Sequence, residues 1–286
     1  MEIRLKMSQE QGVLHAGLDS GIQHPSLFGW ISDFINKTLV ITELEVRKLR
    51  HDPTELLTRA AQPALWMLVF GEVFSRVRAI PTGNLSYIDF MAPGILAQSV
   101  LFVAIFYGIA IIWERDLGIV HKFLASPTPR AALILGKALS AGVRAISQAV
   151  IIYLLALVMN VRLSWDPFAL LGILAAVVLG AALFSTFSLI VACIVKTRER
   201  FMGIGQILTM PLFFASNAIY PISIMPDWLK VIANINPLTY EVDALRRLML
   251  AGGTSVHSLS TDFIALIVST IILVTIGAKL YPTVAR

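Results

Sequence analysis

Apolar residues occur along the chain in long runs that polar residues interrupt only at intervals. A helix needs about 20 apolar residues to cross a hydrocarbon core of about 30 Å. Six runs reach or approach that length and predict six membrane-spanning helices, at residues 58–77, 91–113, 131–159, 167–195, 201–220 and 262–282. The first run is the least regular, because Gln62, Pro63 and Glu72 interrupt it. The pattern predicts an all-α integral membrane protein.

Two segments precede the first predicted span. Residues 27–57 are predicted to form an amphipathic interfacial helix, since Trp30 and Phe34 share one helical face and Arg47 and Arg50 follow. Packing of such a helix on protein is the alternative. Residues 1–26 are polar and mixed and predict a flexible cytoplasmic tail.

Three prolines divide the apolar stretch between the fifth and sixth predicted spans, at Pro221, Pro226 and Pro237. The pieces between them are too short to cross a bilayer. Non-helical backbone survives at membrane depth only when it is buried in protein or lines a cavity. We therefore expect short re-entrant or interfacial helices at the outer face.

The composition agrees with this pattern. Of the 286 residues, 57% are hydrophobic and only 14% are charged, whereas soluble globular chains carry about 25% charged residues. The mean hydropathy is +0.77. The net charge of +5 is typical of basic cytoplasmic loops, so no nucleic-acid partner is predicted. Cys193 is the single cysteine, which excludes an intrachain disulfide.

The distribution of Lys and Arg predicts the orientation, because these residues are enriched in cytoplasmic loops. With a cytoplasmic N-terminus and six spans, 17 of the 23 Lys and Arg residues fall on the cytoplasmic side. The chain is thus predicted to be a multi-pass protein of the cell inner or plasma membrane, with both termini in the cytoplasm. The charged segment 114–130 would then be cytoplasmic.

Polar residues inside predicted spans are functional candidates, because they are costly in lipid. Arg144 and Gln148 lie on a polar stripe of the third span, and the fifth span carries Gln206, Thr209 and Asn217. We predict that these five residues line a translocation path. A structural ion pair, a bundle interior or a subunit interface are the alternatives.

The chain lacks the motifs of an enzyme working alone. A phosphate-binding loop is absent, because Ala131 and Ala138 stand where the motif around Gly136-Lys137 needs Gly and Ser or Thr. The five histidines show no metal-ligand spacing, so no metal site is predicted. We predict no catalytic residue and no cofactor bound by this chain.

Three stretches carry a resemblance to a known family: "ELEVRKLRHDPTELLTRAAQPALWMLVFGEVF", "WERDLGIVHKFLASPTPR" and "MPLFFASNAIYPISIMPDWLKVIANINPLTYEVDALR". They frame nearly all of residues 40–285. The chain resembles the membrane subunit of ABC exporters of the type-2 permease class, which includes drug-resistance, nodulation-factor and polysaccharide exporters. Ser216-Asn217-Ala218 departs from that family, which usually has a glycine there.

The resemblance implies a six-span permease domain over residues 58–286 that exports an amphipathic drug, lipid or lipid-linked glycan. It implies a dimer with a second copy or a paralogue, contact with membrane lipid, and a separate cytoplasmic ATPase that holds ATP and Mg. The segment after the second span would be the coupling helix, with contacts from Glu114, Arg115, Asp116, Gly118 and Phe123.

Other functions remain open from the residues alone. The charge cluster at Glu114 fits an ordinary solvated loop, and the chain fits a secondary transporter or channel that works without an ATPase. A non-transporting scaffold is less compatible with the polar stripes inside the spans.

Overall fold

The computed structural model describes residues 27–49, 61–77, 80–83, 85–125, 128–195 and 197–282. The predicted tail 1–26, and Arg50 with the rest of segment 50–57, lie outside these residues. The chain divides into two units, residues 1–36 and 37–286. In the first unit the described part is the helical segment 27–36, which includes Trp30 and the half-buried Phe34.

The predicted interfacial helix corresponds to α2, Leu27–Leu49. Within the second unit its two faces differ: Thr38 and Ile41 are buried, whereas Leu39 and Val40 are 54% and 65% exposed. Arg47 is exposed and pairs with Glu43 one turn earlier at 2.7 Å. One face of α2 therefore packs on protein, and apolar side chains remain on the other.

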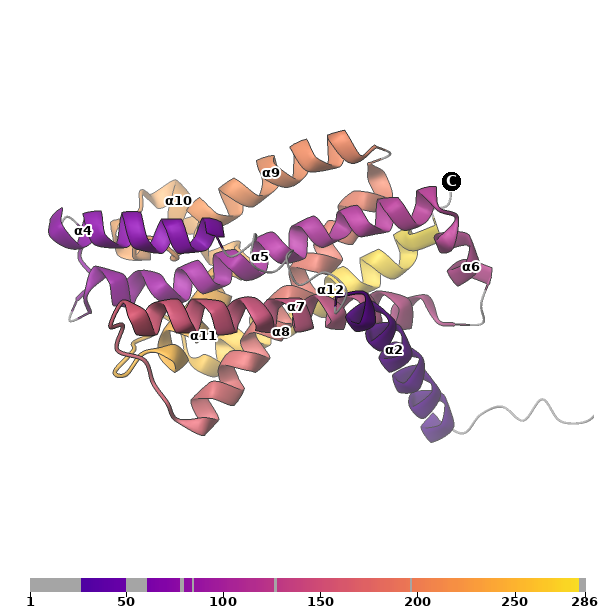
Figure 1. Cartoon of the computed structure of the whole chain (residues 1–286), viewed down its shortest axis with the longest axis horizontal. Helices are drawn as coiled ribbons and strands as arrows, with labels where there is room; N and C mark the ends of the chain where they lie inside the picture. The colour runs from indigo at the N-terminus through magenta and orange to yellow at the C-terminus, as the bar shows by residue number, and fades with distance from the viewer. Residues whose placement is uncertain are drawn as a thin grey trace, which may run out of the picture. The chain divides into compact units, whose positions relative to one another are not determined.

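Four helices of the described residues are long and apolar enough to cross a membrane: α5 (Tyr87–Asp116), α7 (Arg130–Val158), α8 (Pro167–Ile194) and α12 (Leu259–Leu280). They correspond to the second, third, fourth and sixth predicted spans. α8 packs against α5, α7 and α12, and α5 also packs against α7 (Figure 1). In the described part of the chain the only β-pairing is an isolated bridge between Leu163 and Leu250, as expected for an all-α protein.

The other two predicted spans are shorter helices in the described residues. The first covers 61–77 and contains a π-helical turn, η1 (Trp66–Phe70), before α4 (Gly71–Val77). The fifth is α9 (Arg198–Phe214), with Pro211 inside it. Seventeen residues at about 1.5 Å each extend for about 25 Å. The described residues therefore contain four helices long enough to span a membrane, and the helices at 61–77 and 198–214 are shorter.

Small residues allow the central helices to approach closely. A Cβ added at Gly108 of α5 would lie 2.6 Å from the ring of Phe201, and one added at Gly180 of α8 would lie 2.3 Å from the Glu241 carboxyl carbon. Such contacts are typical of membrane helix interfaces, where close packing replaces a hydrophobic driving force.

Capping residues determine where α5 begins. Ser86 and Asp89 form a capping box, in which each side chain accepts a hydrogen bond from the other's backbone N–H. Asp89 is buried and also accepts hydrogen bonds from the backbone N–H and the guanidinium of Arg162, both at 3.1 Å. The start of α5 is thereby joined to the connection between α7 and α8.

The prolines between the fifth and sixth predicted spans start short helices, as the sequence predicts. Pro221 precedes the 3-10 turn η2 (Ile222–Ile224), Pro226 precedes α10 (Asp227–Ile235), and Pro237 is the first residue of α11 (Pro237–Met249). Asn236 accepts from the backbone N–H of Leu238 and donates to carbonyls at the end of α9. α11 is therefore held against the end of α9.

Candidate functional site

A sharp turn follows α5, and we call residues 113–125 the α5–α6 corner. α5 ends at Asp116, and α6 (Ile119–Ala125) begins after only two residues. Gly118 lies between them with φ +71°, a conformation that costs a residue with a side chain more than it costs glycine. Nothing lies within 4 Å of a Cβ added there. The backbone conformation, rather than crowding, is the reason for a glycine at this turn.

A buried ion pair joins the corner to α7. The Nζ atom of Lys137 donates to Oε2 of Glu114 at 2.6 Å, and the two side chains are only 3% and 6% exposed. The same Nζ lies 5.7 Å from the centre of the Phe123 ring on α6. Glu114 therefore points into the protein, and α5, α6 and α7 meet around one pair of charges.

A second set of charges lies on the outside of the corner. Asp116 accepts hydrogen bonds from Arg115 at 3.1 Å and from Arg198, at the start of α9, at 2.8 Å. The Arg198 guanidinium also stacks on the Trp113 ring at 3.4 Å. Asp116 is exposed, so this network borders solvent and links the corner to α9.

The second part of α2 packs on α7 next to the buried ion pair. Thr42 donates to the Gly136 carbonyl at 3.2 Å, and a Cβ added at Gly136 would lie 2.7 Å from Cβ of Ile41. Gly136 directly precedes Lys137. The amphipathic helix and the α5–α6 corner are thus connected through consecutive residues of α7.

The polar stripe of α7 faces α5. The Tyr107 hydroxyl and the Ser140 hydroxyl are 2.9 Å apart, and the Arg144 guanidinium lies 5.1 Å from the centre of the Tyr107 ring. Gln148, one turn further, is fully buried. The stripe is therefore part of the interior of the helix bundle, which was one of the alternatives for it.

The candidate residues of the fifth predicted span differ in their surroundings. Gln206 is exposed on α9, whereas Thr209 is buried and donates to the Gly205 carbonyl of its own helix. Asn217 lies beyond the end of α9, is fully buried, and donates to Asp243 at 3.5 Å. The five predicted path residues thus lie in three separate segments: α7, α9 and the stretch after α9.

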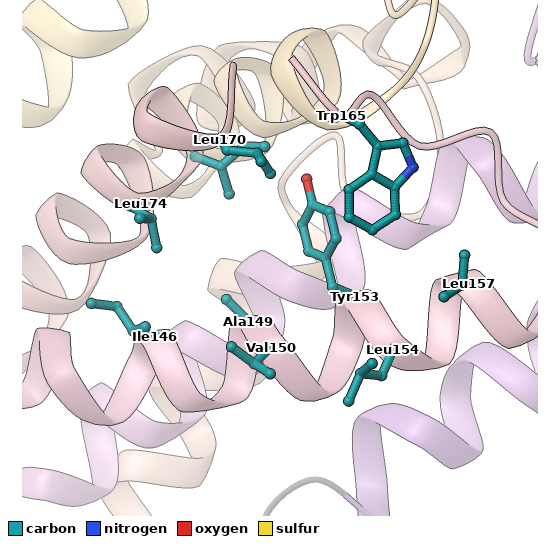
Figure 2. Close-up of a pocket in the computed structure, with 10 residues that line it drawn as sticks. Ile146, Ala149, Val150, Tyr153, Leu154, Leu157, Trp165, Leu170 and Leu174 are labelled. Atoms are coloured by element: carbon teal, nitrogen blue, oxygen red, sulfur yellow. The ribbon is translucent and has the colours of Figure 1, made fainter. Parts of the chain in front are cut away.

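An apolar pocket of about 340 Å³ lies between α7 and α8. Figure 2 shows the Tyr153 ring rising from α7 beside the Trp165 indole, and their ring centres are 6.4 Å apart. A larger apolar groove of about 910 Å³ lies between α9 and α10, with Ile207 and Trp228 among its lining residues.

The family model of the ABC-2 type transporter matches residues 36–250, which include α5, the α5–α6 corner and α11. The chain belongs to the ABC-2 type transporter family. Among its relatives are the transport permease ycf38 of Cyanophora paradoxa, 28% identical over 74% of each chain, and the daunorubicin resistance permease DrrB1 of Streptomyces coeruleorubidus, 24% identical over 75% of each chain. Nodulation protein J of Sinorhizobium fredii is 26% identical over 71% of this chain and 78% of its own.

In this ABC-2 permease the departure at Ser216-Asn217-Ala218 needs no glycine. In the described residues the only non-glycine with positive φ is Asn160, so these three have ordinary backbone conformations. The glycine needed for close packing is instead Gly94 on α5. A Cβ added at Gly94 would lie 2.2 Å from the Ala218 carbonyl oxygen.

Arg246 is not among the functional residues that the sequence predicts. Arg246 is buried in α11, donates to the Asn217 carbonyl at 2.7 Å and to the Phe90 carbonyl at 3.4 Å, and lies 3.9 Å from the Phe90 ring centre. Burial lowers the pKa of Arg246 to about 10, and the charge of nearby Asp243 opposes this shift. Arg246 therefore stays charged at neutral pH and holds the segment after α9 against α5.

Glu241 on α11 was also missed. Its side chain is fully buried against Gly180, and burial raises the pKa of its carboxyl group well above the ordinary value. Both residues follow the Asn236-Pro237 turn, where the sequence predicts a short re-entrant or interfacial helix, and no local signal marks them as buried.

Proposed function

We propose that this membrane permease is the subunit of an ABC exporter that moves an amphipathic substrate (a drug, a lipid or a lipid-linked glycan) outward. A separate cytoplasmic ATPase holds ATP and Mg and supplies the energy. The observation that carries the proposal is the buried Glu114–Lys137 pair, which joins the end of α5 to α7 and lies beside the Phe123 ring of α6. A helix joined in this way transmits a push on its exposed face to two long helices.

The outer surface of the corner provides the contact for the ATPase. Asp116, His121 and Lys122 are exposed charged or polar side chains, and Leu117 is 67% exposed. Charge-assisted hydrogen bonds around an exposed apolar side chain suit a protein partner. Glu114 and Phe123 would act from inside by keeping α6 in place, and Arg115 by orienting Asp116.

All six predicted spans cross the membrane in this proposal, including 61–77 and α9, and both termini are cytoplasmic. Residues 27–57 lie at the cytoplasmic surface, where the exposed Leu39 and Val40 face lipid or the ATPase. Residues 58–286 form the permease domain.

A second copy of the chain, or a paralogue, would cover the groove between α9 and α10. The exposed apolar side chains there include Ile207, Trp228 and Ile235. Gln206 is exposed on the same helix, and a polar amide that faced lipid would be costly. Facing a partner or a translocation path removes that cost, so Gln206 supports a protein-covered α9.

We also propose that Arg144, Gln148, Thr209 and Asn217 line the translocation path. Their side chains face the interior of this chain. The apolar pocket between α7 and α8 supports an amphipathic rather than a strongly charged substrate, because its lining is apolar apart from the Tyr153 hydroxyl and the Trp165 indole N–H (Figure 2).

Asp116→Ala is expected to weaken ATPase binding about 10-fold, the loss of one well-placed contact. The melting temperature of the purified permease should change little, because the Asp116–Arg198 pair is partly exposed. Asp227→Ala, which removes an aspartate whose side chain is 98% exposed on α10, is the matched control and should bind the ATPase normally.

Copurification of the permease with the ATPase measures this effect. Equal ATPase binding by the Asp116 and Asp227 variants would show that the α5–α6 corner does not contact the ATPase. Flux driven by an ion gradient in liposomes without any ATPase would instead favour a secondary transporter or channel.

The proposed topology predicts opposite labelling of two exposed alanines, Ala125 on α6 and Ala251 in the connection between α11 and α12. In a Cys193→Ser background, Ala251→Cys should react with a membrane-impermeant thiol reagent in intact cells. Ala125→Cys should react only after permeabilisation. The reverse pattern would invert the orientation, and equal labelling would contradict the span count.

A further inference from the structure

Three metal-binding side chains meet where α11, the following connection and α12 come together. They are Asp243 on α11, His257 in the connection and Asp262 in the first turn of α12, and one ligand atom of each lies within 4.8 Å of the other two. Nδ1 of His257 is 3.5 Å from Oδ2 of Asp243 and 4.0 Å from Oδ1 of Asp262.

Asp243 is held in place by the connection that wraps around it. Its carboxylate accepts hydrogen bonds from the backbone N–H groups of Val256 at 3.0 Å and His257 at 2.7 Å, and from the Asn217 amide at 3.5 Å. The Tyr240 ring lies 5.1 Å from the imidazole. Such contacts orient a ligand before an ion arrives.

Within the described residues, Asp262 lacks such hydrogen bonds. Its side chain is fully buried, and neither carboxylate oxygen accepts a hydrogen bond from the residues that the structure describes. An acidic residue in the first turn of a helix is ordinarily explained by the helix dipole. Here the exposed N–H of Thr261 is already capped by Ser258. A buried, unpartnered carboxyl group close to an imidazole suggests a missing ligand.

We propose that Asp243, His257 and Asp262 bind a divalent transition-metal cation, with Zn²⁺ as the best match. One imidazole nitrogen and two carboxylate oxygens are a ligand set that Zn²⁺ accepts, and water completes the coordination. Metal bonds of about 2.0–2.1 Å place tetrahedral ligand atoms about 3.3 Å apart. The separations of 3.5 and 4.0 Å, with all three ligand atoms within 4.8 Å of one another, are somewhat longer than this value, so ion binding would draw the ligand atoms closer.

The ion would tie the first turn of α12 to α11 and the connection through Asp262, whose carboxylate accepts no hydrogen bond from the described residues. Arg247, which donates to Ser255 at 3.3 Å, is the nearby exposed cation. A protonated His257 that pairs with both carboxylates is the competing account of the cluster. The two accounts differ in whether stability depends on added metal.

Zn²⁺ binding to the full-length, detergent-solubilised permease, stripped with a chelator, tests the proposal. One Zn²⁺ per chain should bind and raise the melting temperature, because an ion that binds only the folded state stabilises it. His257→Ala and Asp262→Asn should weaken binding by at least about 10-fold and abolish the rise. Asp227→Asn, at an aspartate whose side chain is 98% exposed on α10, is the matched control and should bind Zn²⁺ and melt as the wild type does.

His257 has a side chain that is 25% exposed, so His257→Ala provides a readout even if Asp262→Asn does not fold. Zn²⁺ binding that is equally tight in the wild type and the His257 variant would overturn the proposal by placing the ion elsewhere. A wild-type melting temperature that depends on pH but not on Zn²⁺ would also overturn it, and would leave an ion pair only.

Discussion

Glu114→Ala is expected to destabilise the permease by about 3–5 kcal/mol, because it removes the carboxylate that neutralises the buried Lys137 ammonium. The two side chains are only 6% and 3% exposed, and the bond between them is 2.6 Å long. Water therefore cannot easily replace the lost carboxylate. Thermal melting of the purified protein and transport into membrane vesicles measure the effect, and both should fall together.

Replacing both members of the Glu114–Lys137 pair with apolar residues separates the effect of the charges from the effect of packing. The double variant Glu114→Leu with Lys137→Met removes both charges at once and should melt within a few kcal/mol of the wild type, since buried ion pairs are often replaceable by apolar residues. Loss of transport in this stable double variant would show that the charges take part in coupling. A single Glu114→Ala variant that melts like the wild type would contradict the buried pair.

The contrast with Asp116 follows from burial. Asp116 lies on the outside of the same corner and is exposed, so its replacement should affect ATPase binding much more than stability. Replacement of Glu114 should mainly lower the stability of the permease. The two substitutions therefore distinguish the residue that anchors α6 from a residue that contacts a partner.

Gly94→Ala is the second substitution expected to have a large effect, a destabilisation of about 1–3 kcal/mol. The added Cβ would lie 2.2 Å from the Ala218 carbonyl oxygen and 2.8 Å from its carbonyl carbon. These are backbone atoms and cannot rotate away. Arg246 also holds the neighbouring Asn217 carbonyl at 2.7 Å, so the segment can move only by breaking that bond. Thermal melting measures the loss.

Gly205→Ala is the matched control, because Gly205 is also buried inside a helix. There an added Cβ would meet only Cγ2 of Ile105, at an ordinary distance of 3.5 Å. Since alanine favours a helix by about 1 kcal/mol over glycine, the melting temperature should stay the same or rise. Similar melting of the two variants would show that Ala218 does not lie against Gly94.

Hydrophobic periodicity predicted the long helices well. The runs at 91–113, 131–159, 167–195 and 262–282 correspond to α5, α7, α8 and α12, since the thickness of a bilayer imposes their length. It predicted the less regular spans less well. Pro211 lies inside α9, and a π-helical turn interrupts the helix at 61–77.

The sequence also indicated which residues are chemically unusual without indicating their partners. Lys137 is buried against Glu114, 23 residues earlier in the chain, and nothing in the local sequence indicates this pairing. Arg246, in the segment between the fifth and sixth predicted spans, is likewise buried, in α11.

The sequence by itself determined the membrane class, the four long apolar helices, the short helices after each proline and the family, because these depend on local composition, length and ordered motifs. Only the tertiary structure decided that Glu114 faces Lys137, that the polar stripe of α7 faces α5, and that Asp243, His257 and Asp262 meet. Each of these contacts joins different elements. Its existence depends on how helices rotate and approach one another, and the spacing of residues along one chain does not contain that information.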